Sequence, residues 1–206
     1  MTTPSGPHAA TRAARAAGAV LTAVLLLLVS GCAPSTDDPA STATAEASAE
    51  PVAQEPAPEG EGFNDPGGRY TMTVPATWQA DHEAIGGSIE VWYIAKPEDG
   101  FAPNVNVLTE DIRGMSVEDY TQLSIANGPR LLPGFELLKT DVVTGPGGHD
   151  LMTMSYTDGE AKYLGVIGMG ADGAVVATLT STPERYLSIV EESYPYLLTL
   201  LPTDAT

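Results

Sequence analysis

The chain has 206 residues and a formal net charge of −18 at pH 7, with 27 acidic and nine basic side chains. Phosphate backbones and anionic headgroups repel so acidic a chain, which excludes nucleic acid as an expected partner. Cys32 is the only cysteine, and this excludes an internal disulfide and a zinc site built from several thiolates.

Residues 1–31 have the organisation of a secretory signal peptide. Arg12 and Arg15 precede an apolar run of 14 residues, 16–29. That run is shorter than the roughly 20 residues needed to span a bilayer and is typical of a signal-peptide apolar region. The small residues Ser30-Gly31 follow, as a signal-peptidase site requires.

The motif Val29-Ser30-Gly31-Cys32 resembles the lipobox of bacterial lipoproteins. The resemblance implies that the Cys32 sulfur receives a diacylglyceryl group and that cleavage leaves Cys32 as the first mature residue. Two acyl chains would hold the protein on the extracytoplasmic face of the cell membrane, because a single chain anchors only marginally. A non-lipidated signal or a short membrane anchor is the alternative.

Residues 32–62 are expected to be a lipidated cysteine followed by a disordered linker. The stretch is mostly Ala, Pro, Ser, Thr and acidic residues, with Val52 as its one sizeable aliphatic side chain. It cannot bury enough apolar surface to offset the entropy of ordering. As a flexible chain it would span roughly 30 Å. It is either a spacer that lifts a domain off the membrane or unselected low-complexity sequence.

Residues 63–206 are expected to form one α+β domain, large enough to bury about two-thirds of its unfolded surface. Because the linker carries seven acidic residues and no basic one, and Arg12 and Arg15 leave with the signal, this domain has a net charge near −13. Apolar and polar positions alternate from Arg69 to Val74, and Pro75 ends this strand.

More strands and a helix follow. The β-branched and aromatic content of 89–95 and 104–109 predicts two strands. Ser116 with acidic residues just after it indicates a helix start, and Asn127-Gly128-Pro129 its end. Four strands are then predicted near 135–143, 150–156, 161–169 and 174–181. The turn signals between them are Gly145-Pro146-Gly147-Gly148, Asp158-Gly159 and Asp172-Gly173.

A last helix is predicted to begin at Thr182-Pro183, an N-cap followed by proline at the first helical position. Pro195 should kink or divide that helix. Its apolar stripe at helical spacing comprises Tyr186, Val190, Ser193 or Tyr194, Leu197 and Leu201. Strands joined by short turns, with helices inserted and appended, predict an α+β domain on an antiparallel sheet.

Three segments resemble landmarks of the PsbP-like superfamily. Tyr70-Thr71-Met72-Thr73-Val74-Pro75-Ala76-Thr77-Trp78 is similar to its opening, and Phe101-Ala102-Pro103-Asn104-Val105-Asn106-Val107 to its second landmark. The third is Val176–Ser181 with the helix after it. Within the superfamily, the LpqN/LpqT group of actinobacterial lipoproteins is the most similar. The resemblance implies an α-β-α sandwich with a central antiparallel sheet and a non-catalytic adaptor, assembly or binding role.

The same landmarks have a plain structural interpretation. Trp78 is expected in the core, because a large indole is usually buried. Asn104 and Asn106 are expected to bond the neighbouring backbone rather than a ligand.

Few residues suggest catalysis or cofactor binding. Gly168–Gly173 matches G-x-G-x-x-G, but a strand-like segment follows it, so Asp172-Gly173 is interpreted as a hairpin turn and no cofactor is expected. Asp81-His82-Glu83 is interpreted as a solvated loop rather than a metal site, and no metal is expected. The adjacent carboxylates Glu110 and Asp111 are interpreted as a solvated strand end.

Three functional hypotheses remain. The first is a non-catalytic protein-binding or assembly module with a partner in the cell envelope. The second is a carrier or sensor of a lipid or small apolar ligand, with a pocket lined by residues such as Met72, Trp92, Met152, Met154 and Tyr156, although ordinary core packing explains that set as well. The third is an envelope enzyme that uses His149 and Asp150, for which no paired nucleophile is found. The first is preferred, and no catalytic residue is assigned.

Overall fold

The computed structural model describes residues 58–81, 89–97, 100–145 and 148–205. The signal segment 1–31, the lipidation site Cys32 and the linker up to residue 57 lie outside the described residues. His82 and Glu83 also lie outside them, so the predicted solvated loop at this point stays a prediction.

The described residues form ten strands and two helices. The strands are β1 (Glu61–Asn64), β2 (Tyr70–Val74), β3 (Gln79–Ala80), β4 (Glu90–Tyr93), β5 (Asn104–Glu110), β6 (Glu136–Thr144), β7 (Asp150–Thr157), β8 (Lys162–Gly170), β9 (Gly173–Ser181) and β10 (Leu201–Pro202). The helices are α1 (Val117–Leu131) and α2 (Tyr186–Leu197).

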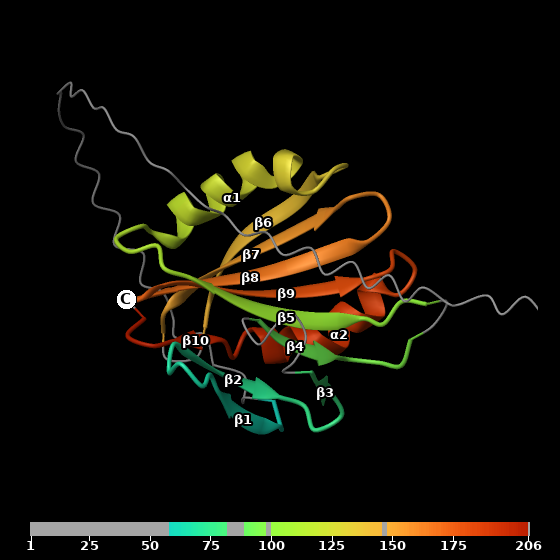
Figure 1. Cartoon of the computed structure of the whole chain (residues 1–206), viewed down its shortest axis with the longest axis horizontal. Helices are drawn as coiled ribbons and strands as arrows, with labels where there is room; N and C mark the ends of the chain where they lie inside the picture. Colours follow the sequence, from blue (N-terminus) through green and yellow to red (C-terminus); the bar gives the residue numbers. More distant parts are fainter. Residues whose placement is uncertain (1–57, 82–88, 98–99, 146–147, 206) are drawn as a thin grey trace, which may run out of the picture. The chain divides into compact units, whose positions relative to one another are not determined.

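The strands form two antiparallel sheets. The larger has seven strands in the order β3-β4-β5-β9-β8-β7-β6, and the smaller has three in the order β1-β2-β10. Figure 1 shows α1 on one face of the large sheet and α2 with the small sheet on the other. The predicted α+β architecture, an α-β-α sandwich with a central antiparallel sheet, is therefore confirmed.

The central strands are apolar on both faces. In β8, Leu164 and Val166 belong to the core beneath α2, whereas Ile167 and Met169 belong to the core beneath α1. Successive side chains of a strand point to opposite faces of the sheet. Both faces must therefore be covered if the apolar side chains of such a strand are to be buried. Helices packed on the two faces meet this requirement.

The larger core lies between the large sheet, α2 and the small sheet. Tyr70, Leu151, Leu179 and Leu197 are at most 2% exposed there. Trp78 is also in this core, with its ring centroid 5.9 Å from that of Tyr196, as the sequence predicted. The smaller core lies beneath α1.

Helix α1 begins as predicted and ends later. The Ser116 hydroxyl accepts a hydrogen bond from the amide of Asp119 at 3.1 Å, so Ser116 is the N-cap. The predicted end near Asn127-Gly128-Pro129 is wrong, because the helix continues to Leu131 with Pro129 inside it. A proline in the last turn removes one helical hydrogen bond, and the amide of Leu132 still bonds the Gly128 carbonyl at 2.8 Å.

Helix α2 begins later than predicted. Residues 182–185 form a turn in which the Arg185 amide bonds the Thr182 carbonyl, and regular helix starts at Tyr186. The buried Tyr186 explains this start, because its hydroxyl donates to Ser155 Oγ at 3.2 Å and holds the first turn against the sheet.

Two further details of α2 also differ from the prediction. Pro195 does not divide the helix, which is continuous to Leu197, because the proline lies in the last turn where few helical bonds depend on it. Leu201 is not part of its apolar stripe, since it belongs to β10 and is 38% exposed.

The first strand lies at the predicted linker–domain boundary. Glu61 pairs with Val74 and Gly62 with Thr73, so residues 61 and 62 belong to β1 rather than to the linker. The sequence also did not indicate β3 and β10, because two-residue strands carry too few residues for a periodic pattern.

Replacing Leu151 with Ala should lower the free energy of unfolding by about 3 kcal/mol, because it opens a cavity at a fully buried position. Leu187→Ala is the matched control: this leucine is 78% exposed, so a change within about 0.5 kcal/mol is expected. Urea denaturation measures both. Equal losses would contradict the core described above.

Candidate functional site

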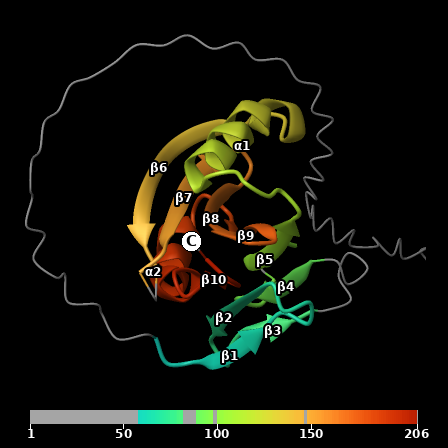
Figure 2. The same ribbon diagram turned by 90° about the vertical axis from the view of Figure 1, so that its left-hand side faces the viewer.

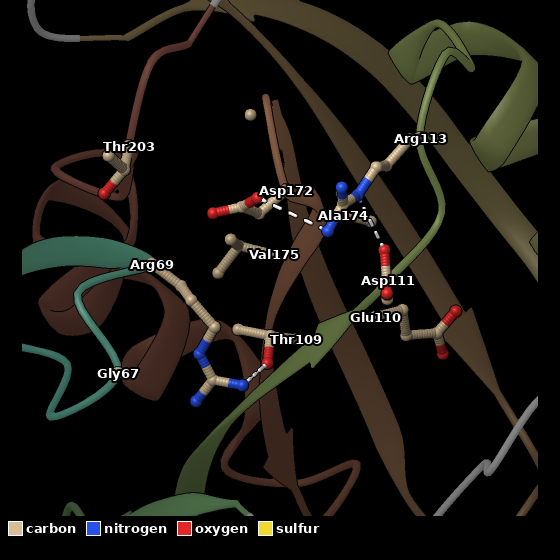
Figure 3. Close-up of a pocket in the computed structure, with 12 residues that line it drawn as sticks. Gly67, Arg69, Thr109, Glu110, Asp111, Arg113, Asp172, Ala174, Val175 and Thr203 are labelled. Atoms are coloured by element: carbon tan, nitrogen blue, oxygen red, sulfur yellow. Dashed lines mark hydrogen bonds and ion pairs between the residues drawn. The ribbon is translucent and has the colours of Figure 1, made fainter.

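An open, polar cleft lies at one end of the large sheet. Its volume is about 420 Å³. It is bounded by the turn before β2, the end of β5 and the β8–β9 hairpin. The polar residues that line it are Arg69, Thr109, Glu110, Asp111, Arg113, Asp172 and Thr203 (Figure 3). We call this recess the polar cleft.

Each of the three guanidinium nitrogens of Arg69 donates a hydrogen bond to another residue of the protein. Its Nε and Nη2 donate to the two carboxylate oxygens of Asp65 at 2.8 and 2.9 Å, and its Nη1 donates to the Thr109 hydroxyl. Asp65 is 4% exposed, and the hydrogen bonds from Arg69 hold the pKa of its carboxyl below the usual value. Arg69 therefore acts as a structural clamp between the turn before β2 and strand β5.

Arg113, by contrast, is an exposed cation between two exposed carboxylates. Its Nε lies 2.9 Å from Asp111 Oδ1, and its Nη2 lies 3.6 Å from Asp172 Oδ1. Figure 3 shows the guanidinium between these two carboxylates. The side chain of Arg113 is 65% exposed, that of Asp111 is 77% exposed and that of Asp172 is 67% exposed. Exposed ion pairs contribute little to stability, so their partners can exchange.

Glu110 points away from its neighbour Asp111. The Tyr120 hydroxyl of α1 is hydrogen-bonded to Glu110, and burial raises the pKa of this carboxyl above its usual value. Its Oε2 is buried and has no hydrogen-bond partner among the described residues. The two carboxylates do diverge, as extended backbone requires, but the interpretation of Glu110 as a solvated residue is wrong because α1 covers it.

Gly173 brings the hairpin close to β5. Its φ is +126°, and a side chain there would collide with the carbonyl oxygen of Glu110. Only glycine permits this approach, which carries Asp172 toward Arg113. The predicted hairpin between β8 and β9 is confirmed, but its turn residues are Ala171 and Asp172, because Gly173 pairs with Gly170 as the first residue of β9.

His149 has a structural environment. It is 8% exposed, its Nε2 lies 3.1 Å from the carbonyl oxygen of Leu200, and its Nδ1 has no hydrogen-bond partner within the described ranges. Asp150 is exposed at the start of β7. The Nε2 contact ties the segment before β7 to the segment after α2.

The side chains proposed to line an apolar pocket do not come together. Met72 and Trp92 lie in the core beneath α2, whereas Met152 lies in the core beneath α1. Met154 and Tyr156 share the face of Met152 by strand alternation. The large sheet therefore divides the set, and core packing accounts for it.

Two remaining expectations concern ligands. Asn104 Nδ2 donates to the Ala102 carbonyl at 3.0 Å, which confirms a backbone role for this residue. In the part of the chain that the structure describes, no three His, Cys, Asp or Glu side chains are placed to hold a metal ion.

Neither described helix is long and apolar enough to cross a membrane.

Sequence reasoning missed the polar cleft. Its charged residues come from three segments separated by dozens of positions, and no local motif joins them. One signal was available: seven basic residues serve the whole domain, and two of these, Arg69 and Arg113, are in the polar cleft.

Comparisons with known proteins support the fold. No protein-family model and no curated protein matches the sequence. Among solved structures, cyanobacterial PsbP (CyanoP) of Synechocystis sp. PCC 6803 is similar, with a TM-score of 0.50 and 14% identity over 69% of this chain and 91% of that one. This likeness shows that the domain has a PsbP-like fold.

Two further solved structures are similar. A protein of unknown function from Pseudomonas aeruginosa has a TM-score of 0.49 and 20% identity over 64% of this chain and 90% of that one. LpqN of Mycobacterium tuberculosis, described as involved in cell envelope biogenesis, has a TM-score of 0.44 and 14% identity over 69% and 90%.

Arg69→Met should lower the free energy of unfolding by about 2 kcal/mol near neutral pH, because it leaves the buried Asp65 carboxylate without its partner. Arg69 lowers the folded-state pKa of Asp65 below 3.8, so this stabilisation is present above that pH and is lost as pH falls through the folded-state value. Urea denaturation at about pH 7 and about pH 3 measures the change.

Arg113→Met is the matched control for this experiment. It removes only exposed ion pairs, those to Asp111 and Asp172, so a loss below about 1 kcal/mol is expected at both pH values. If Arg69→Met costs the same in acid as at neutral pH, the clamp on Asp65 is not the source of its stabilisation.

Proposed function

We propose that this protein is a membrane-anchored, extracytoplasmic lipoprotein that acts as a non-catalytic protein-binding or assembly module in the cell envelope. Lipid on Cys32 holds it at the membrane, and residues 33–57 lead to the folded domain. The polar cleft is its docking site for an envelope protein.

The exposed triad of Asp111, Arg113 and Asp172 carries this proposal. Each of these side chains is more than half exposed, and together they offer a cation between two anions at the rim of an open recess. A protein surface with the reciprocal pattern can exchange ion pairs with this triad at little cost. Such complementarity sets partner choice and association rate more than raw affinity.

The charge of the domain indicates the kind of partner. A net charge near −13 attracts basic protein surfaces over about a Debye length and repels nucleic acid. The division of Met72 and Met152 between two packed cores gives no support to a carrier of apolar ligands. We therefore favour a protein with a basic docking surface.

Cys32→Ala should release the protein from the membrane fraction and abolish its labelling by a fatty-acid probe. Each buried methylene contributes about 0.8 kcal/mol, so loss of two acyl chains removes nearly all membrane affinity. Fractionation of producing cells with immunoblotting measures release. A Cys32→Ala protein that stays in the membrane fraction would show that the anchor is elsewhere.

A photo-reactive residue at position 172 should capture an envelope protein in intact cells, and the same residue at position 187 should not. Position 187 is a suitable control because Leu187 is 78% exposed and lies on α2. Reversing the central charge with Arg113→Glu should reduce the yield at position 172 by roughly fivefold, because one reciprocal pair becomes repulsive.

Equal capture at both positions would count against the polar cleft as the docking site. Native mass spectrometry of the domain after exposure to an envelope detergent extract tests the competing function. A reproducible added mass in the lipid range would overturn the protein-binding proposal in favour of a carrier.

A further inference from the structure

Strand β6 is a long, exposed edge of the large sheet. It is the last strand in the order, and within the described ranges it pairs with β7 alone. Every residue of Glu136–Thr144 is exposed except Val143. Leu138 and Val142 are 47% and 52% exposed. An edge of this kind presents unpaired backbone groups that can accept another strand.

Two features of β6 restrict what can pair with it. A β-bulge between Leu137 and Lys139 interrupts the ladder near its start, so regular alternation runs from Lys139 onward. Lys139 and Asp141 lie on one face, with Lys139 Nζ 2.6 Å from Asp141 Oδ2. That face carries α2, because their partners Ser155 and Thr153 point there. Charges on an edge strand commonly prevent unspecific pairing.

The sequence of β6 is self-complementary about Thr140. We propose that two copies of this chain associate by antiparallel pairing of their β6 edges, with the two-fold axis at Thr140. In this register Lys139 of each copy lies opposite Asp141 of the other, and the bulge at Leu138 lies outside the regular ladder. A two-fold interface needs such a self-complementary surface, in which residue i meets j and j meets i.

The four charges form an alternating square. Each Lys139 has its own Asp141 along the strand and the second copy's Asp141 across the new ladder, where directly opposed side chains are neighbours. The neighbouring two-fold registers are disfavoured, because an axis at residue 139 places Lys139 against Lys139 and an axis at 141 places Asp141 against Asp141. The charges therefore favour one register.

The helices leave room for this pairing. Helix α1 packs on β7 and β8, and α2 packs on β2, β8 and β9. Figure 2 shows β6 at the rim of the curved sheet, outside both helices. The exposed side chains of Val142 and Thr140 lie on the α1 face, by their pairing with Met152 and Met154. A second copy would cover the exposed side chains of Thr140 and Val142 and pair the outer backbone groups of Lys139–Asp141.

Thr140→Cys in the full chain should form a disulfide-linked dimer under mild oxidation. At the axis the two Cα atoms would be about 4.5–5.5 Å apart, within disulfide range. Val142→Cys is the control: its two copies would be about 13 Å apart, which is too far. Non-reducing gels of producing cells measure both variants, with the unaltered chain as the baseline for Cys32.

A charge exchange tests the register independently of folding. In the Thr140→Cys background, Lys139→Asp alone and Asp141→Lys alone should each reduce the linked dimer by about tenfold, because both cross-strand pairs become repulsive. Mixing the two variants, with tags of different size, should restore the dimer as a mixed species. A variant that merely unfolds cannot be rescued by mixing.

Three outcomes would overturn the inference: no linked dimer from Thr140→Cys, equal linkage from Val142→Cys, or no mixed species from the charge-exchanged pair. The variants lie outside the polar cleft, so these outcomes do not depend on the fate of the docking proposal. Circular dichroism of each variant checks that the fold is retained.

Discussion

The fold of the domain depends on one constraint: both faces of its central strands must be shielded from water. β8 and β9 carry apolar side chains on the α1 side and the α2 side alike, with Val166 and Ile167 at most 1% exposed on opposite faces. A sheet of this kind is stable only when both faces are covered. The helices, the small sheet and the position of Tyr186 all follow from that requirement.

The two surfaces proposed for binding lie where the sheet is not covered on both faces. At the ends of β5, β8 and β9 the sheet meets solvent, and charged side chains replace apolar ones in the polar cleft. At the rim, β6 pairs with β7 alone among the described strands, and none of its residues is buried. Ends and edges are the parts of a sheet that retain unpaired polar groups, so both proposed surfaces arise from the layout of the sheet.

The two arginines of the polar cleft have different roles because their surroundings differ. Arg69 is bonded to a buried carboxylate and a strand hydroxyl, and it holds the wall of the recess. Arg113 stays exposed between two exposed carboxylates. Because a buried polar group loses its exchange with water, the first pair stabilises the fold, whereas the second can exchange its partners.

Local chemistry determined the features that the sequence predicted well. Ser116 predicted a helix start because an N-cap needs only its own turn, and Asp172-Gly173 predicted a hairpin because a two-residue turn is a local conformation. The long strands β7 to β9 and the antiparallel α+β architecture followed from alternation and turn spacing, whereas the PsbP-like sandwich was expected from the resemblance of three segments to that superfamily. The start of α2 was misplaced because docking of Tyr186, a distant contact, sets it.

By itself, then, the sequence determined an acidic domain, its order of long elements and its α+β class, because these depend on composition and short-range periodicity. Only the tertiary structure decided that Arg113 meets Asp172, that Glu110 is covered by α1, that the methionines belong to two separate cores and that β6 is the edge. These facts depend on which strands become neighbours, and strand order is set by long-range packing that no local pattern encodes.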